Sequence, residues 1–104
     1  MSYTVVLITA PSAGEGKKIG RLLLAKKLAA CVSRVPGVAS SYWWKGKIER
    51  SLENLLIIKT HSSKLPRLIA EVKKNHSYAV PEVIALPVIK GNPDYLTWVG
   101  KSLK

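Results

Sequence analysis

The feature that most constrains the fold is a long extended stretch, residues 31–58, that can turn back on itself at Lys45-Gly46. Before this turn, aromatic residues stand side by side in an extended pattern, and after it an apolar run covers residues 55–58. Such segments are typical of β-strands, and a glycine that accepts positive φ suits a tight turn between two strands. Pro36-Gly37 interrupts the first arm and indicates a bend. The sequence therefore predicts a long β-hairpin, which implies an antiparallel sheet.

Two further segments predict the remaining strands. Residues 3–9 are rich in β-branched side chains and end before Pro11, which is typical of a short buried strand. Residues 80–89 are also strand-like, but Pro81 and Pro87 lack the N–H that a strand interior donates. The second segment is therefore expected at a sheet edge or beside bulges.

Three helices are predicted from their capping residues. Ser12 followed by Glu15 has the spacing of a capping box, in which each side chain satisfies a free backbone N–H of the other residue. Ser62 or Ser63 is the expected N-cap of a second helix, which has an apolar stripe and two lysines near its end. Asp94 is expected to cap a short final helix.

The order of strand, helix, strand, strand, helix and strand predicts an α+β fold. It is the order of the split βαβ or ferredoxin-like arrangement, in which an antiparallel sheet carries both helices on one face. We expect residues 1–104 to form a single domain of this kind. Because only the short final helix is left to cover the second face of the sheet, we expect the chain to associate with copies of itself.

Charge and cysteine content narrow the function classes. The chain has 17 basic and 6 acidic residues, a net charge of +11, which favours anionic partners such as nucleic acid. The basic residues are spread along the chain without a nucleic-acid-binding motif, so specific recognition is not indicated. One cysteine cannot form an internal disulfide, and a reducing cytoplasm is the expected location. The apolar runs are too short to span a membrane, and no standard catalytic motif predicts an enzyme.

Four polar residues each allow two interpretations. His76 continues the apolar stripe of the second helix, either as a hydrogen-bonded helix-end residue or as a ligand. Glu82 lies in an apolar run, so its carboxylate is expected either to pair with a lysine or to bind a ligand. Cys31 is either a small buried residue or a metal ligand, and Lys59 either extends to solvent or points into a cleft. Tyr42, in the hairpin beside two tryptophans, belongs to a core, a subunit interface or a stacking platform for bases.

In combination, several motifs resemble the CutA family of divalent-cation-tolerance proteins over nearly the whole chain. The motifs are Leu7-Ile8-Thr9-Ala10-Pro11, Leu28-Ala29-Ala30-Cys31-Val32, Pro36-Gly37-Val38, Tyr42 with Trp44 and Gly46, Lys47-Ile48-Glu49, Ile57-Ile58-Lys59-Thr60, His76 with Tyr78, Val80-Pro81-Glu82-Val83-Ile84-Ala85-Leu86-Pro87, and Gly91 with Tyr95, Leu96 and Trp98. Each motif alone is weak, but in this order they are specific.

The resemblance implies a PII-like subunit in a cytoplasmic homotrimer with a role in tolerance to divalent cations, copper above all, and no established catalysis. It implies a metal site of Cys31, His76 and Glu82. A ligand cleft between subunits would be formed by Lys59, Tyr78, Tyr42 and Trp44.

Three hypotheses for the function follow. The first is a homotrimer that binds copper or another divalent metal without catalysis. The second is a PII-like module that binds a small anionic ligand between subunits, and the third is a basic protein that binds nucleic acid. Metal binding predicts dependence on Cys31 and His76, anion binding predicts dependence on Lys59, and nucleic-acid binding predicts a steep loss of affinity with salt.

Overall fold

The computed structural model describes residues 2–104, which form four strands, three α-helices and one 3₁₀ turn. The strands β1 (Tyr3–Ala10), β2 (Cys31–Trp44), β3 (Lys47–His61) and β4 (Val83–Pro87) pair in the order β2-β3-β1-β4. Every pairing is antiparallel. The predicted α+β class and antiparallel sheet are therefore confirmed.

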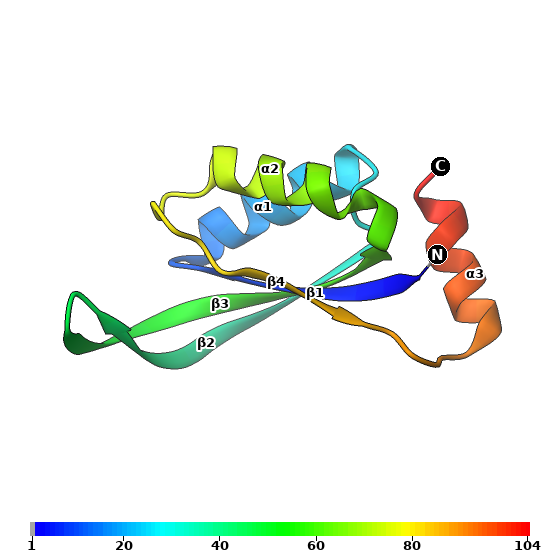
Figure 1. Ribbon diagram of the computed structural model, residues 1–104. Coiled ribbons are helices and arrows are strands. Elements are labelled where there is room, and N and C mark those ends of the chain that lie inside the picture. The colour runs from blue at the N-terminus through cyan, green and yellow to red at the C-terminus, as the bar shows by residue number, and fades with distance from the viewer. Residues whose placement is uncertain (1) are drawn as a thin grey trace.

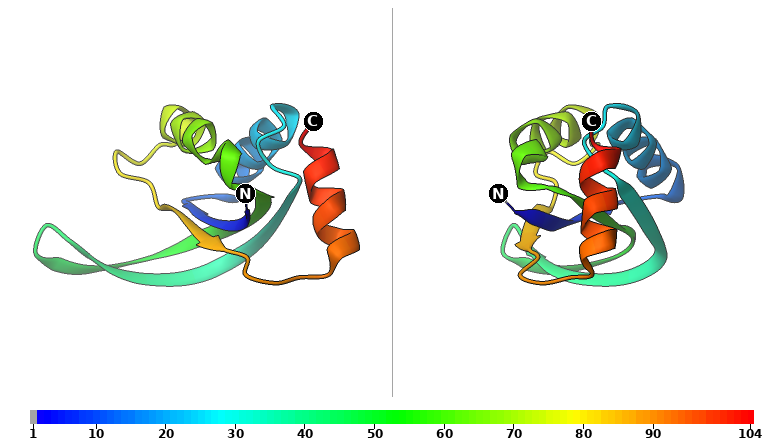
Figure 2. Two further views of the ribbon diagram at one scale, coloured as in Figure 1. Left: turned by 45° about the vertical axis from the view of Figure 1, so that its right-hand side comes forward. Right: turned by 90° about the vertical axis from the view of Figure 1, so that its right-hand side faces the viewer.

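The helices α1 (Ala13–Ala25) and α2 (Leu65–Asn75) lie on the same face of the sheet (Figure 1). The helix α3 (Pro93–Ser102) stands at the end of the sheet opposite the hairpin tip, in Figure 1 and in the left view of Figure 2. Among residues 2–104, no helix is long and apolar enough to cross a membrane.

The predicted hairpin joins β2 to β3 and extends beyond the helices (Figure 1). Lys45 and Gly46 both have positive φ, 52° and 78°, as a two-residue turn matched to the strand twist requires. The register shifts between Val35 and Val38, where Gly37 has a φ of 68°. The turn and the bend at Pro36-Gly37 both lie where the sequence predicts them.

The last strand is at an edge of the sheet, as its prolines predicted, because within residues 2–104 β4 pairs only with β1. It is shorter than the predicted segment, since it spans Val83–Pro87. Residues 88–92 then connect it to α3.

The N-terminus of α1 confirms one half of the predicted capping box. Ser12 Oγ accepts a hydrogen bond from the Glu15 backbone N–H, 3.2 Å away. The carboxylate of Glu15 does not return to Ser12, because its Oε2 accepts hydrogen bonds from the backbone N–H and Oγ of Ser77. The Glu15 carboxylate thus binds a loop that is distant in sequence instead of the N-cap residue.

The predicted caps of the other two helices are wrong. The serines expected to cap α2 lie in the 3₁₀ turn η1 (Ser62–Lys64), where His61 Nδ1 accepts from the Ser63 N–H. The N-cap residue of α2 is Lys64, whose side chain makes no capping hydrogen bond. The cap of α3 is Asn92, because its side chain accepts from the Asp94 N–H and Pro93 occupies the first turn.

Side-chain alternation along β1 and β3 divides the sheet into two unequal faces. Val6, Ile8, Leu56 and Ile58 point toward the helices and are fully buried. They pack with helix side chains that are likewise inaccessible to solvent, namely Ile19, Leu23, Leu68 and Val72. On the opposite face the sheet is uncovered in one chain, and Ile84 and Leu86 of β4 are 50% and 49% exposed.

Candidate functional site

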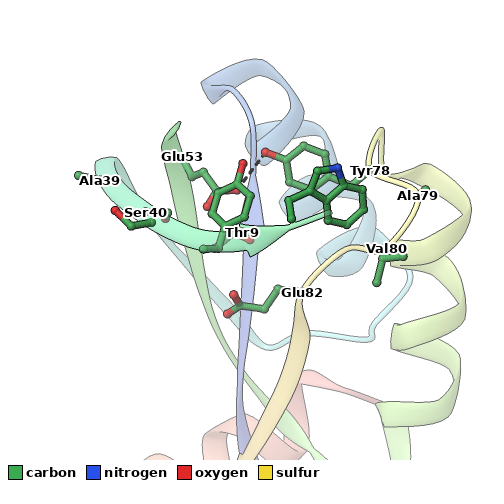
Figure 3. A pocket seen from close by; sticks show the side chains of 11 residues that line it. Thr9, Ala39, Ser40, Glu53, Tyr78, Ala79, Val80 and Glu82 are labelled. Carbon is green, nitrogen blue, oxygen red and sulfur yellow. Dashed lines mark hydrogen bonds between the residues drawn. The ribbon is translucent and has the colours of Figure 1, made fainter. Parts of the chain in front are cut away.

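A cavity of about 720 Å³ lies where the hairpin meets the loop that follows α2 (Figure 3). Its walls come from the end of β1, from both arms of the hairpin and from residues 78–82. They are lined by Thr9, Ala39, Ser40, Ser41, Tyr42, Trp44, Glu53, Tyr78, Ala79, Val80 and Glu82. The cavity is large enough to hold a small organic molecule.

Tyr78 and Glu53 are joined by a hydrogen bond in the wall of this cavity (Figure 3). The phenol of Tyr78 donates to Glu53 Oε2 over 3.0 Å, and Glu53 is only 6% exposed. Burial raises the pKa of Tyr78 to about 12, and the hydrogen bond to Glu53 and nearby negative charge add to the rise. The phenol is therefore a hydrogen-bond donor throughout the physiological pH range.

His76 lies behind the cavity and holds the loop that carries Tyr78. The Tyr78 N–H donates to His76 Nδ1 over 3.0 Å, so the ring proton must be on Nε2. Nε2 then donates to the carbonyl oxygen of Thr9, 2.7 Å away. Both ring nitrogens of this buried side chain are engaged, which favours the interpretation of a hydrogen-bonded helix-end histidine.

Cys31 and Lys59 lie together but outside the cavity. They are register partners on β2 and β3, and Lys59 Nζ is 4.0 Å from Cys31 Sγ. Tyr95 of α3 is also a neighbour, since burial and then contact with Cys31 raise the pKa of its phenol. Lys59 pairs with Val5, four residues from the cavity residue Thr9 along β1, a separation of about 13 Å.

The structure thus brings together only part of the predicted site. Tyr42, Trp44, Tyr78 and Glu82 line one cavity, whereas Cys31 and Lys59 lie toward the α3 end of the sheet. Among residues 2–104, no three His, Cys, Asp or Glu side chains of one chain are close enough to hold a metal ion. The predicted ligands Cys31, His76 and Glu82 are not a cluster within one chain.

Four polar residues that line the cavity were not among the predicted site residues, namely Thr9, Ser40, Ser41 and Glu53. The signal for Glu53 was present, because it directly precedes Asn54 and an apolar run. A carboxylate beside a buried apolar run needs a partner or a ligand, and the same reasoning singled out Glu82.

Comparison with known proteins assigns the family. Residues 4–102 match the sequence profile described as CutA1 divalent ion tolerance protein. The chain belongs to this family. The resemblance inferred from the sequence motifs is therefore confirmed.

Two curated CutA relatives illustrate the similarity. The chloroplastic Protein CutA 1 of Oryza sativa subsp. japonica is 50% identical over 100 residues, which cover 96% of this chain and 56% of that protein. The chain therefore spans about half the length of this relative. The Divalent-cation tolerance protein CutA of Thermus thermophilus is 45% identical over 95 residues, covering 91% of this chain and 92% of the relative.

Crystal structures of CutA proteins have the same fold. CutA1 from Oryza sativa matches with a TM-score of 0.95 and 49% identity, covering 98% of this chain and 94% of the other. CutA from Xylella fastidiosa matches with a TM-score of 0.96 and 36% identity over the full length of both chains. The sheet and the helices described above are therefore shared within the family.

Proposed function

We propose that this chain acts in divalent-cation tolerance as a non-catalytic cytoplasmic homotrimer that binds copper or another divalent metal. The strand order β2-β3-β1-β4 with α1 and α2 on one face supports a ferredoxin-like, PII-like subunit. The absence of catalysis is proposed because the sequence carries no standard catalytic motif and the family resemblance implies none.

The observation that carries the homotrimer is the uncovered apolar face of the sheet. Ile84 and Leu86 of β4 are half-exposed there, and Val35 of β2 is 40% exposed on the same face. Apolar side chains grouped in this way mark a protein interface in a soluble protein. Further copies of the chain are the proposed partners because the family motifs imply a trimer.

The proposed metal site uses ligands from more than one copy. Cys31 supplies a soft sulfur ligand, which suits copper in its reduced state, and it lies on the uncovered face. Glu82 supplies an exposed carboxylate. His76 would have to lose its contacts with Thr9 and Tyr78 before it could ligate a metal.

Native mass spectrometry and copper titration under reducing conditions test this proposal. We expect trimers at micromolar concentration and tight copper binding that Cys31→Ser abolishes. Ser33→Ala is the matched control, because residue 33 follows two positions later on β2 and points to the same face. A monomer, or copper binding that Cys31→Ser leaves unchanged, would contradict the proposal.

The proposed anion-binding alternative finds no support in the cavity, whose lining contains no lysine, arginine or histidine among the described residues.

Nucleic-acid binding has a specific observation in its favour. The exposed basic residues of α1 and α2 lie in one layer, and they are Lys17, Lys18, Arg21, Arg67, Lys73 and Lys74. The two acidic residues of these helices, Glu15 and Glu71, already contact Ser77 and Lys26.

A binding titration with a duplex oligonucleotide at several salt concentrations tests this second candidate. Contacts between lysines and phosphates release counterions, so the affinity should fall steeply with salt. Lys17→Gln with Lys73→Gln should reduce both the affinity and its salt dependence. Lys90→Gln with Lys104→Gln is the control, since it removes the same charge outside α1 and α2. Equal effects of the two double variants would argue against a site on the helical layer.

A further inference from the structure

The cavity has the opposite charge to the rest of the chain. In a sequence with 17 basic and 6 acidic residues, its lining includes two glutamates, Glu53 and Glu82. No basic side chain among the described residues lines it. The lining therefore offers a cation two carboxylates, although the chain as a whole is positively charged.

Glu53 provides a carboxylate oxygen that has no partner. The side chain is more than nine-tenths buried and lines the cavity (Figure 3). Tyr78 donates to its Oε2, but within residues 2–104 no hydrogen bond reaches Oε1. No buried side-chain oxygen in this part of the chain lacks a partner, so Oε1 is accessible from the cavity rather than sealed in the core. The oxygen that is left open is thus a place for a positively charged ligand.

Aromatic side chains form the other part of the wall. Tyr42 and Trp44 are two residues apart on β2, so their side chains leave the strand on the same side, and Tyr78 lies across the cavity on the loop. The faces of such rings attract organic cations through their quadrupoles. The raised pKa of Tyr78, to which the charge of Glu53 contributes, is consistent with negative potential at this wall.

Size and ligand number distinguish an organic cation from a metal ion. No three metal-ligating side chains of residues 2–104 converge, and a volume of about 720 Å³ far exceeds the space that one bare ion fills. We propose that this cavity binds an organic ammonium cation between the carboxylates of Glu53 and Glu82 and the rings of Tyr42, Trp44 and Tyr78. The proposal shares Glu82 with the proposed copper site but does not require Cys31, which lies on β2 toward the α3 end of the sheet.

Calorimetric titration of the full chain tests the proposal with two probes of equal shape. Choline carries a quaternary ammonium, and dimethylbutanol is its uncharged isostere with carbon in place of nitrogen. We expect choline to bind at least about tenfold more tightly, since only the cation interacts with the carboxylates and ring faces. A metal chelator in the buffer should leave choline binding unchanged, which separates this site from the proposed copper site.

Variants locate the binding. Trp44→Leu and Glu82→Gln should each weaken choline binding by about fivefold or more, by removal of a ring or a carboxylate. Trp43→Leu is the control for the ring, because the neighbouring tryptophan does not line the cavity, and Asp94→Asn is the control for the lost charge on α3. Circular dichroism and native mass spectrometry confirm that each variant is folded and assembled.

Three results would overturn the proposal. One is equal binding of choline and dimethylbutanol, which would mean that the cavity recognises only apolar shape. Another is no binding of either probe to the folded protein. The third is an equal loss of choline affinity in Trp43→Leu and Trp44→Leu, which would place the site elsewhere.

Discussion

The two faces of the sheet are built from the same strands but differ in how far their side chains are buried. Ile58 points toward α1 and α2 and is fully buried, whereas Ile57, the preceding residue, points to the uncovered face. The covered face is a largely apolar core, in which the buried hydroxyl of Thr60 donates a hydrogen bond to the Leu28 carbonyl oxygen. The uncovered face carries Cys31 and Lys59 toward one end and the acidic cavity at the other. In this fold the covered face holds the apolar core, and the other face stays uncovered in one chain.

The largest expected difference between the faces is in core packing. Ile58→Ala should lower the free energy of unfolding by about 2–5 kcal/mol, because it leaves a void between the sheet and the helices. Ile57→Ala should cost at least about 1 kcal/mol less in dilute protein, where its side chain is only partly buried. Denaturant unfolding at low concentration measures both values. An equal loss would mean that the second face is packed as tightly as the first.

The strands and helices were predictable because their signals are local. The strands were recognised by β-branched runs and prolines, and the turn by Gly46, all within a few residues. The N-cap residues of the helices were harder to predict, because neighbouring polar side chains compete for the same backbone N–H groups. Asn92 rather than Asp94 caps α3 because Pro93 begins the helix, a local signal that was available. The carboxylate of Glu15, in contrast, is held by Ser77, a contact across 62 positions that no local pattern contains.

The candidate site was only partly predictable because strand register is a long-range property. The family motifs implied that Lys59 shares a cleft with Tyr78, Tyr42 and Trp44. The pairing places Lys59 opposite Val5, level with Leu86, whereas Glu82 precedes the other end of β4. The aromatic residues of β2 reach the cavity because the bulge after Val35 and the twist of the hairpin direct their side chains there. The sequence indicates a bend at this point, but it does not determine which side of the sheet the later side chains face.

The next prediction concerns assembly through the uncovered face. Ile84→Lys places a charge on a half-exposed position of β4 whose side chain makes no part of the core cluster. If this face binds further copies of the chain, the substitution should raise the dissociation constant by at least about tenfold while the subunit stays folded. Native mass spectrometry over a dilution series measures the change. Ser33→Lys on the exposed β2 position of the same face tests how far the contact extends. A trimer of undiminished stability in both variants would show that assembly uses another surface.

A smaller effect is expected from Tyr78, whose ionisation makes the stability of the folded chain depend on pH. Its pKa is raised from 10.0 to about 12 in the folded protein, with burial as the main cause and Glu53 as the next. Below pH 10 both the folded and the unfolded chain keep this proton. Between pH 10 and about 12 the unfolded chain loses it first, so the stability that Tyr78 contributes declines as the pH rises through this window.

Unfolding measurements across that window, with and without the substitution Tyr78→Phe, isolate this contribution. The decline in stability should be less steep in Tyr78→Phe, and also in Glu53→Gln, because the second variant removes a charge that opposes ionisation of the phenol. An unchanged slope in both variants would show that Tyr78 does not titrate with folding.

The smallest effect is expected from two glycines of α1 that differ in their contact with the covered face. Gly14 has no atom within 4 Å of the place where a Cβ would stand, so Gly14→Ala should raise the stability by about 0.5–1 kcal/mol through helix propensity. At Gly20 the same Cβ would lie 3.1 Å from Cγ1 of Val32, a side chain with little rotational freedom. Gly20→Ala should therefore gain nothing or lose stability, although it gives the helix the same propensity. Thermal unfolding of the two variants measures the difference. If both variants gained equally, β2 would be free to move away from α1, and the close packing that distinguishes the covered face would not extend to this strand.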